Sequence, residues 1–487
     1  MSDSGKLSPE VRAVAIVVIA GAIMSILDTT IVNVAIETLT RDLHAPLSTV
    51  QWVSTGYLLA LATVIPLTGW AAERFGPKRV WMTAVAAFAM TSALCGLAWN
   101  IETLIPFRVL QGVAGGMIMP VGMITLAQAA GPARMGRVMS VVGVPMLLAP
   151  VLGPVIGGFL VTQVSWRWIF YVNVPIGIVG LVLASRLLHR DRAVGREGGT
   201  GHLDRLGLAL LSPGVALVVF GLSKVATDGR VGTTGVLVPM ALGAVLIGLF
   251  ARHAWRTEYP LVEVRLLANG GFAAAAVTIV LVGAALFGGM LLLPLYYQVD
   301  RGLSALQAGL LLAPQGLGAA IAMNVGGRLT DRIGGGPVVV AGLAILSLGT
   351  LPFTQVGADT SYWVLGAALF VRGLGLGAAM MPAMASAYAL LERHEVPRAT
   401  PLLNVLQRIG GSLGVALLAV VLERRLGEIG PAASPTAVAE AFGHTYWWAL
   451  ALTTVAMLPA LVLARAQRSA RREAAASSTP PVPTPVG

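Results

Sequence analysis

The chain has 487 residues, of which 56% are hydrophobic and only 11% are charged. A soluble domain carries about 25% charged residues, so this composition excludes an ordinary soluble protein. The formal net charge of +11 could suit nucleic-acid binding, but membrane topology also explains an excess of basic residues.

Long apolar segments recur along the whole chain. A helix needs about 20 apolar residues to cross a bilayer. Such segments fall near 14–36, 51–71, 80–99, 104–129, 138–161, 168–188, 206–223, 233–251, 271–297, 305–325, 337–355, 362–387, 401–422 and 446–464. They predict an all-α integral membrane protein with 14 transmembrane helices, whose even number places both termini on one side.

The basic residues indicate which side that is. Of the 33 Lys and Arg residues, 23 fall on the side of the termini, 7 on the opposite side and 3 within the spans. Because positively charged loops stay in the cytoplasm, we expect cytoplasmic termini. The positive charge is then topological, and we expect no nucleic-acid partner.

One short charged segment occurs twice, 258 residues apart. The segment 69–76 follows the second apolar run, and the segment 327–334 follows the tenth; each holds an acidic residue followed by arginine between two glycines. A repeated hinge predicts two related six-helix bundles around an inserted pair of helices. The expected domains are 1–189 (first bundle), 190–265 (linker and helices 7–8), 266–466 (second bundle) and 467–487 (disordered cytoplasmic tail).

The repeated hinges are candidates for gating. Their gating residues are Gly69, Glu73, Arg74, Gly76, Asp331 and Arg332. An acidic side chain can cap a neighbouring helix N-terminus, and the adjacent arginine can bind a carboxylate or a lipid phosphate. We expect such contacts to hold the cytoplasmic side closed and to open during a transport cycle; a solvated turn is the alternative.

Asp28 is the one acidic residue well inside a predicted span. A charge at the bilayer centre costs about 2.5–3.5 kcal/mol, so such a residue normally faces a cavity and has a function. Asp28 precedes Ile36 by eight residues and should lie ~12 Å below the outer end of the first helix. We expect a proton or cation site, with a purely structural carboxylate as the alternative.

Three arginines also lie within spans. Arg108 enters the fourth helix near the level of Asp28 and is a candidate partner for it, although it could instead only cross-link helices. Arg372 and Arg408 have no acidic partner nearby in sequence. They could bind anions, waters or carbonyl groups, and the sequence leaves their structural or functional role open.

Helix five contains closely spaced glycine and proline residues. Gly153 and Gly157 lie one turn apart, next to Pro154 and Gly158. Small residues allow close helix approach in lipid, and proline bends a helix. We expect a bend at a moving interface, with tight packing alone as the alternative.

Methionines cluster in helices four and twelve. They are Met117, Met119, Met123, Met380, Met381 and Met384. Flexible thioethers suit a promiscuous apolar site, but methionine is also ordinary core filler.

Several enzyme signatures are missing from the sequence. It has no phosphate-binding Gly-x-x-x-x-Gly-Lys-Ser/Thr loop and no His-Glu-x-x-His zinc motif. We therefore expect no enzyme activity, no ATP use, no cofactor and no metal site. The expected partners are a small-molecule substrate, protons and the lipid bilayer, with an ion gradient as the energy source.

Several motifs together resemble one family. They are the hinge, Arg108-x-x-Gln111-Gly112, Gly153-Pro154-x-x-Gly157-Gly158, the segment 27–35, Gln51-Trp52 with Tyr57, and the segment 166–175. These look like the motifs of the major facilitator superfamily, and in particular of its fourteen-helix drug:proton antiporter branch.

The resemblance implies export of lipophilic, often cationic compounds in exchange for protons by alternating access. Asp28 takes the place of the family's helix-one carboxylate, and Arg108 that of its helix-four arginine. The candidates for the substrate cavity are Asn33, Gln51, Tyr57, Gln111, Met117 and Arg408. Glu73 replaces the usual aspartate, Ala149 stands where glycine is common, and no carboxylate lies deep in a C-terminal span.

Two other functions stay open. A dedicated exporter of a single metabolite or antibiotic would have the same motifs, and a membrane sensor could keep the transporter fold without moving its ligand. In either case we expect a multi-pass protein of a bacterial cell membrane, acting as a monomer.

Overall fold

The computed structural model describes residues 8–131, 134–188, 202–228, 232–357, 359–392, 394–430 and 434–477. Within these ranges the side chains of residues 33, 144–151, 154, 226–228, 305–306 and 470–477 are not described. All regular structure in the described ranges is helical. Most of the expected linker (189–201) and the last ten residues (478–487) lie outside them.

The N-terminal half of the molecule contains five long helices and several short ones. Its elements are α1 (Pro9–Asp42), α2 (Leu47–Val50), α3 (Trp52–Val64), η1 (Ile65–Leu67), α4 (Thr68–Phe75), α5 (Pro77–Gly96), α6 (Ile101–Ala130), α7 (Met135–Gln163), α8 (Trp168–Tyr171) and α9 (Asn173–Leu187). Side-chain caps mark where helices begin: Ser8 accepts a hydrogen bond from the Val11 amide, and Asn100 accepts one from the Thr103 amide.

The inserted pair and the C-terminal half follow. The pair is α10 (Arg205–Asp228) and α11 (Thr234–Arg256). The C-terminal elements are η3 (Val264–Ala268), α12 (Gly270–Leu295), η4 (Tyr296–Asp300), α13 (Ala305–Leu311), α14 (Ala313–Ile333), α15 (Gly335–Thr350), η5 (Leu351–Gln355), α16 (Tyr362–Ala389), α17 (Val396–Ile429) and α18 (Pro435–Ser477).

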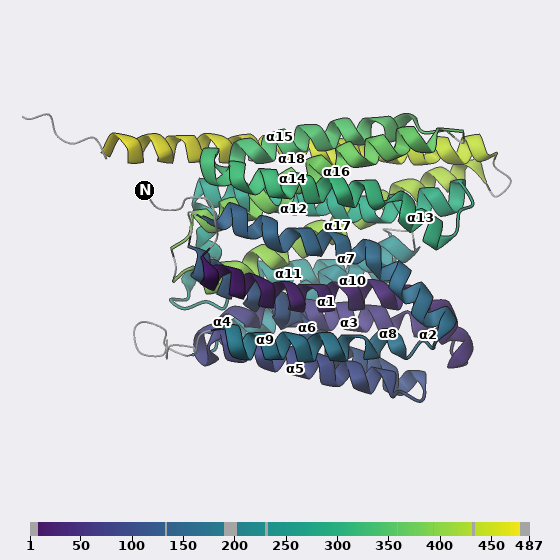
Figure 1. Cartoon of the computed structure of the whole chain (residues 1–487), viewed down its shortest axis with the longest axis horizontal. Helices are drawn as coiled ribbons and strands as arrows, with labels where there is room; N and C mark the ends of the chain where they lie inside the picture. The colour runs from purple at the N-terminus through teal and green to yellow at the C-terminus, as the bar shows by residue number, and fades with distance from the viewer. Residues whose placement is uncertain are drawn as a thin grey trace, which may run out of the picture.

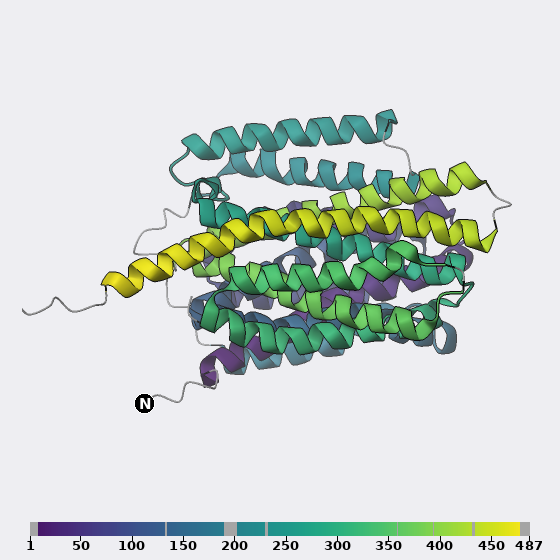
Figure 2. The ribbon, with the colours of Figure 1, turned by 90° about the horizontal axis from the view of Figure 1, so that it is seen from above.

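The helices form two bundles that lie side by side (Figure 1). Helices α1 and α3–α9 make one bundle and α12–α18 the other, and they meet where α7 packs on α14 and where α4 packs on α17. The inserted pair lies along one flank, as Figure 2 shows from above: α10 contacts α17 and α3, and α11 contacts α10. Helix α1 begins and α18 ends at the same end of the molecule.

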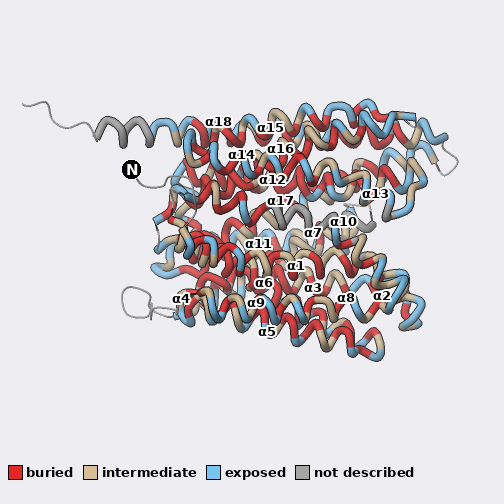
Figure 3. Tube along the Cα trace, in the orientation of Figure 1, coloured by how far each residue is buried: buried red, intermediate tan, exposed pale blue. Residues whose placement is uncertain are grey.

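Buried residues concentrate between the helices, whereas many apolar side chains on the outside are exposed (Figure 3). Outward-facing residues such as Trp363, Phe159 and Leu458 expose more than half of their surface. Such an apolar exterior is unfavourable in water and is what a lipid-facing surface needs.

Thirteen helices in the described residues are long and apolar enough to cross a membrane. They match thirteen of the fourteen expected runs. The remaining run, 138–161, falls on α7, a 29-residue helix with several side chains outside the described part of the chain. The count of 14 spans and the cytoplasmic location of the termini therefore stay predictions.

Several helices differ in length from the expected runs. The second run is interrupted at Pro66, where the 3₁₀ turn η1 separates α3 from α4, because proline has no N–H to donate. The last run, expected at 446–464, extends over Pro435–Ser477. The helix thus continues through eleven residues for which we expected disorder. Polar residues that follow an apolar run do not end a helix when they are good helix formers, as alanine, arginine and glutamate are here.

The two hinges have the same backbone shape. Gly76 ends α4 with φ of 88°, and Gly334 ends α14 with φ of 93°. Side chains disfavour this region of φ, so glycine is required for the chain to turn directly into the next helix. The repeat seen in the sequence is therefore also a repeat of local structure.

Candidate functional site

Asp28 lies at the centre of a buried polar cluster inside the N-terminal half. Its Oδ2 accepts a hydrogen bond from Arg108 Nη1 at 2.7 Å, and its Oδ1 accepts bonds from Gln111 Nε2 at 2.9 Å and Asn173 Nδ2 at 2.8 Å. All four side chains are at most 1% exposed. We call Asp28, Arg108, Gln111 and Asn173 the Asp28 cluster. The partnership of Asp28 and Arg108 expected from the sequence is confirmed.

Arg108 is held from several sides. Its Nη1 also donates to Gln111 Oε1 at 2.7 Å, and its Nε donates to the Val53 carbonyl at 3.0 Å. The guanidinium lies 4.2 Å from the centroid of the Tyr57 ring, a cation–π distance. These contacts join α1, α3 and α6, so the position of Arg108 depends on how the helices of this half pack.

Asn173 is not among the site residues predicted from the sequence, although it lies in the segment 166–175. Asn173 begins α9 and donates both to Asp28 and to Ser92 Oγ, the latter at 3.1 Å. Its Oδ1 is buried and has no hydrogen-bond partner in the structure. A polar side chain between apolar neighbours at a helix start was the available signal, and it resembled an ordinary helix cap.

Asp28 lies further from the end of its helix than the sequence suggested. Helix α1 continues to Asp42, six residues beyond the expected end of the apolar run. Fourteen residues separate Asp28 from that end, so the carboxylate lies ~21 Å below it at 1.5 Å per residue. This depth places the charge far from both ends of a 34-residue helix.

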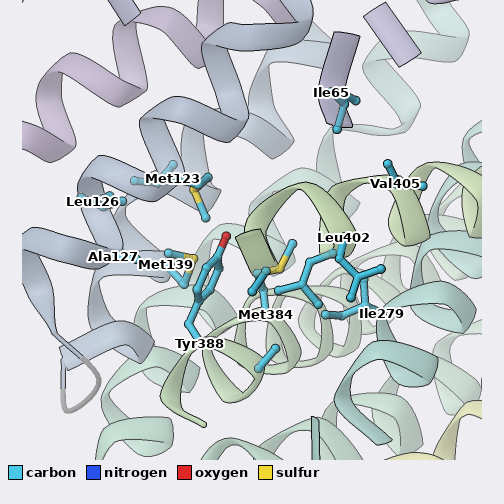
Figure 4. Packing of buried hydrophobic residues seen from close by; sticks show 14 of the residues in the cluster. Ile65, Met123, Leu126, Ala127, Met139, Ile279, Met384, Tyr388, Leu402 and Val405 are labelled. Atoms are coloured by element: carbon cyan, nitrogen blue, oxygen red, sulfur yellow. The ribbon is translucent and has the colours of Figure 1, made fainter. Parts of the chain in front are cut away.

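A separate cavity of about 40 Å³ lies between the two halves. Its lining is apolar except for Asn404 and Gln407, and includes Met119, Met123, Met139, Met380, Met381 and Met384. Figure 4 shows part of this region, with Met123 and Met139 of one half facing Met384 and Leu402 of the other. The methionines that the sequence placed in two separate helices thus meet across the interface.

The substrate-cavity candidates occupy different places. Tyr57 and Gln111 are fully buried at the Asp28 cluster, and Gln51 is exposed at the start of α3. Met117 packs against the buried core. Arg408 follows Gln407 of the lining directly, and the side chain of Asn33 lies outside the described residues. None of these candidates is among the lining residues, whereas five methionines of the two predicted clusters are: Met119, Met123, Met380, Met381 and Met384.

The first hinge contacts the opposite half through an ion pair. Arg398 in the first turn of α17 binds both oxygens of Glu73, at 3.1 Å to Oε1 and 3.3 Å to Oε2. The α4 backbone approaches so closely that a Cβ on Gly69 would collide with the Pro397 carbonyl. This bidentate pair and close approach make the first clasp between the halves.

The second hinge contacts the opposite half through a helix N-terminus. Asp331 Oδ1 accepts a hydrogen bond from the Gly136 amide at 3.0 Å, and Asp331 Oδ2 lies 4.0 Å from Arg137 Nε. Because α7 begins at Met135, the carboxylate sits where the helix dipole favours negative charge. A Cβ on Gly327 would collide with Ser140 Oγ. Asp331, Gly136 and Arg137 form the second clasp.

The expected capping role of Asp331 is thus confirmed, whereas Glu73 binds an arginine. In both clasps the cationic or donor group comes from the opposite half. The hinge arginines themselves, Arg74 and Arg332, are exposed.

The glycines of helix five pack against helix one. A Cβ on Gly153 would collide with Thr30 Oγ1, and one on Gly157 would come within 3.2 Å of Ile31 Cγ2. Gly158 faces open space, and the side chain of Pro154 lies outside the described residues. The two buried glycines therefore bring α7 onto α1, the helix that carries Asp28. The expected bend stays a prediction.

The described residues contain no group of three or more His, Cys, Asp or Glu side chains that could hold a metal ion.

Comparisons with known proteins agree with this two-bundle architecture. The family model described as the Major Facilitator Superfamily matches residues 18–415. The chain belongs to the major facilitator superfamily. Members of this family are membrane transporters and not enzymes, which agrees with the two-bundle fold.

Two relatives and one solved structure extend the comparison. The chain is 44% identical over 409 residues to the Multidrug resistance protein B homolog of Mycobacterium tuberculosis, covering 83% of this chain and 75% of that protein. It is 30% identical over 429 residues to the Tetracenomycin C resistance and export protein of Streptomyces glaucescens, covering 88% and 78%. The crystal structure of the major facilitator proton:xylose symporter XylE matches with a TM-score of 0.62 at 12% identity, covering 93% and 95% of the chains.

The solved structure establishes only the shared fold, because its sequence identity is low. The bacterial relatives and the thirteen candidate spans make this chain a multi-pass protein of a bacterial cell membrane.

Proposed function

We propose that this chain is a proton-coupled antiporter that exports lipophilic small molecules by alternating access. Export of drugs is supported by the relative named for multidrug resistance. Proton coupling is supported by one observation above all: a carboxylate, Asp28, is fully buried far from both ends of a membrane-spanning helix. Such a group is costly unless it has a function.

The Asp28 cluster is suited to two protonation states. Ionised Asp28 accepts hydrogen bonds from Arg108, Gln111 and Asn173, which together stabilise the charge. On protonation the carboxyl group becomes a donor and its attraction to Arg108 weakens. Rotation of the Asn173 amide would then present its unpartnered Oδ1 as an acceptor. We propose that this exchange of partners shifts α9 and α6 relative to α1.

The two clasps supply the element that opens. They join the halves at the hinge end of the bundle, which we assign to the cytoplasm. Partly exposed pairs of this kind contribute only about 0–1 kcal/mol each, so a change of protonation elsewhere can open them. Protonation of Asp28 from outside would favour substrate release and return; deprotonation inside would allow reloading.

The gradient supplies enough energy for such a cycle. Moving one charge across 100 mV is worth about 2.3 kcal/mol, to which a pH difference adds. One proton per substrate would therefore sustain a substantial concentration gradient. The cationic preference implied by the family resemblance stays a prediction, since no lining residue of the described cavity is acidic.

The test is transport by purified protein in proteoliposomes with an imposed proton gradient, using ethidium as the substrate. We expect wild type to accumulate ethidium against its gradient and Asp28→Asn to lose accumulation by at least tenfold. Both should still exchange ethidium when no gradient is imposed, because substrate binding is separate from the Asp28 cluster. Equal gradient-driven accumulation by Asp28→Asn would overturn the mechanism.

A matched variant separates coupling from folding. Asp28→Asn leaves the charge of Arg108 buried without a carboxylate, which could unfold the protein. Asp28→Asn with Arg108→Gln removes both charges and should keep the fold, as checked by size-exclusion chromatography. Loss of coupling in this folded double variant would show that the charges act in transport.

A dedicated exporter of one compound is the second candidate function. It is favoured by the relative that is named for tetracenomycin C resistance and export. Gradient-driven export of one compound from a panel of lipophilic substrates, with none for the others, would select this function. Binding without any flux would instead select a membrane sensor.

A further inference from the structure

We propose that Arg408 binds the acidic group of an amphipathic organic anion, whose apolar part occupies the methionine-lined cavity. The proposal rests on the proposed function and specifies its substrate class. It differs from the cationic preference that the family resemblance implies.

Arg408 points from the C-terminal half toward the N-terminal half. Pro397 on α17 contacts Gly69 on α4, and Arg408 lies eleven residues further along α17. Eleven residues make about three full helical turns, so Arg408 is on the face that carries Pro397. Both positions therefore face the opposite half.

The spacing along α17 also gives the distance of Arg408 from the first clasp, measured along the helix axis. Eleven residues along α17 from Pro397 span ~16 Å. Tyr57 precedes Gly69 by twelve residues along the antiparallel α3–α4 segment, a rise of ~18 Å. Arg408 and Tyr57 are therefore at one level. This level is well inside the candidate spans Leu47–Phe75 and Val396–Ile429.

Arg408 has no anionic partner in the described part of the chain. No described carboxylate is within ion-pair distance of its guanidinium, and no described residue forms a hydrogen bond with its side chain. Asp28, the carboxylate of the buried cluster, is already bound by Arg108. The interface at this level therefore carries an uncompensated positive charge, which is costly in a membrane and calls for an anion.

The cavity lies beside Arg408. Asn404 is one turn before Arg408 on α17, and Gln407 is directly adjacent; both line the cavity. The other lining residues are six methionines and aliphatic side chains, which adapt to the shape of an apolar molecule. An apolar body with a single carboxylate or sulfonate would place its acidic group at Arg408, with the two amides as further donors.

The neighbouring residues argue against a cation at this place. Asn404 and Gln407 are neutral, and the methionine sulfurs are weak acceptors. A cation would lie near Arg408 with no carboxylate to offset the repulsion. Two like charges at such close range repel strongly where the effective dielectric constant is low. The charge of Arg408 therefore discriminates between the two signs.

The experiment compares two bicyclic probes of similar size and opposite charge, naphthalene-1-sulfonate and N-methylquinolinium. Gradient-driven uptake of each is measured in proteoliposomes for wild type, Arg408→Gln and Arg408→Lys. The matched control is Arg424→Gln, an exposed arginine on the same helix. We expect wild type to favour the sulfonate, and Arg408→Gln to lower the ratio of sulfonate to quinolinium rates at least tenfold.

Arg408→Lys should keep most of that ratio, and Arg424→Gln should leave it unchanged. A wild-type preference for quinolinium, or the same ratio in wild type and Arg408→Gln, would overturn the proposal. Ethidium is itself a cation, so this proposal predicts slower transport of ethidium than of the sulfonate. Proton coupling is judged separately, from the ratio of wild-type to Asp28→Asn accumulation, which the charge of Arg408 does not change.

If neither bicyclic probe is transported, a direct binding measurement tests the anion site instead. Isothermal titration of naphthalene-1-sulfonate into nanodisc-embedded protein should show saturable binding by wild type that weakens at least tenfold in Arg408→Gln. Equal affinity in the two proteins, or no binding to wild type, would refute the anion site whether or not the protein couples to protons.

Discussion

Each half of the molecule buries an arginine on its helix α6 or α16, the fourth expected span of either half, but the two arginines have different partners. Arg108 on α6 binds the carboxylate of Asp28 on α1. Arg372 on α16 binds Gln315 Oε1 at 2.7 Å and the Ala285 carbonyl at 3.4 Å, and its Nε has no hydrogen-bond partner among the described residues. Leu286 stands 258 residues after Asp28, so the repeat places an apolar side chain where the first half has its acid.

This difference assigns separate tasks to the halves. A carboxylate can take up and release a proton by changing its charge, and the carboxylate in contact with a buried arginine of this pair is Asp28. Arg372 stays charged in either case, because a guanidinium is not deprotonated in proteins. Under the proposed proton coupling, the N-terminal half would exchange protons, while the C-terminal half would keep a fixed positive charge.

The largest effect should come from removing the cation of the first half. Arg108→Met leaves the Asp28 carboxylate buried without its ion pair, and breaking a buried pair costs about 3–5 kcal/mol. We expect a large fall in the thermal midpoint of the purified protein in detergent. Arg108→Met combined with Asp28→Asn should regain much of the loss. A thermal midpoint equal to that of wild type in the single variant would contradict the assigned ion pair.

A smaller effect is expected for the corresponding change in the second half. Arg372→Met removes a cation without leaving a buried carboxylate behind. The loss of one hydrogen-bond partner for Gln315 should cost about 1–3 kcal/mol, offset in part by the relief of a buried charge. The thermal midpoint of Arg372→Met should therefore fall less than that of Arg108→Met. The reverse order would remove the distinction between the halves.

The smallest effect should follow from giving the second arginine an acid. Gln315→Glu keeps the shape of the side chain and makes the 2.7 Å hydrogen bond charge-assisted. Such bonds contribute about 1.5–3 kcal/mol compared with about 1 for neutral ones, so we expect a gain of about 1 kcal/mol. Gln315→Glu in the Asp28→Asn background should not restore coupling. Restored gradient-driven accumulation would show that any buried carboxylate–arginine pair suffices.

Much of the fold followed from the sequence, because long apolar runs and repeated glycine hinges are local signals. Gly76 and Gly334 could be recognised as turning points from their spacing alone. The Asp28–Arg108 pair could be predicted because charged residues inside spans are few.

The remaining parts of the site depend on packing between distant segments. Asn173 reaches Asp28 from 145 residues away, and Arg398 reaches Glu73 from 325 residues away. Neither side chain differs locally from an ordinary cap or loop arginine. The lining of the cavity likewise depends on which faces of α6, α7, α16 and α17 meet, and composition does not specify this.

The position of α10 has a consequence for lateral access from the bilayer. Helix α10 packs against both α3 and α17, with Trp52 of α3 stacked on Phe220 at 6.1 Å, and so covers one of the two seams between the bundles. The opposite seam, between α7 and α14, has no inserted helix over it in the described part of the chain. A lipid-dissolved molecule that enters sideways would therefore be expected between α7 and α14, at the seam that α10 leaves uncovered.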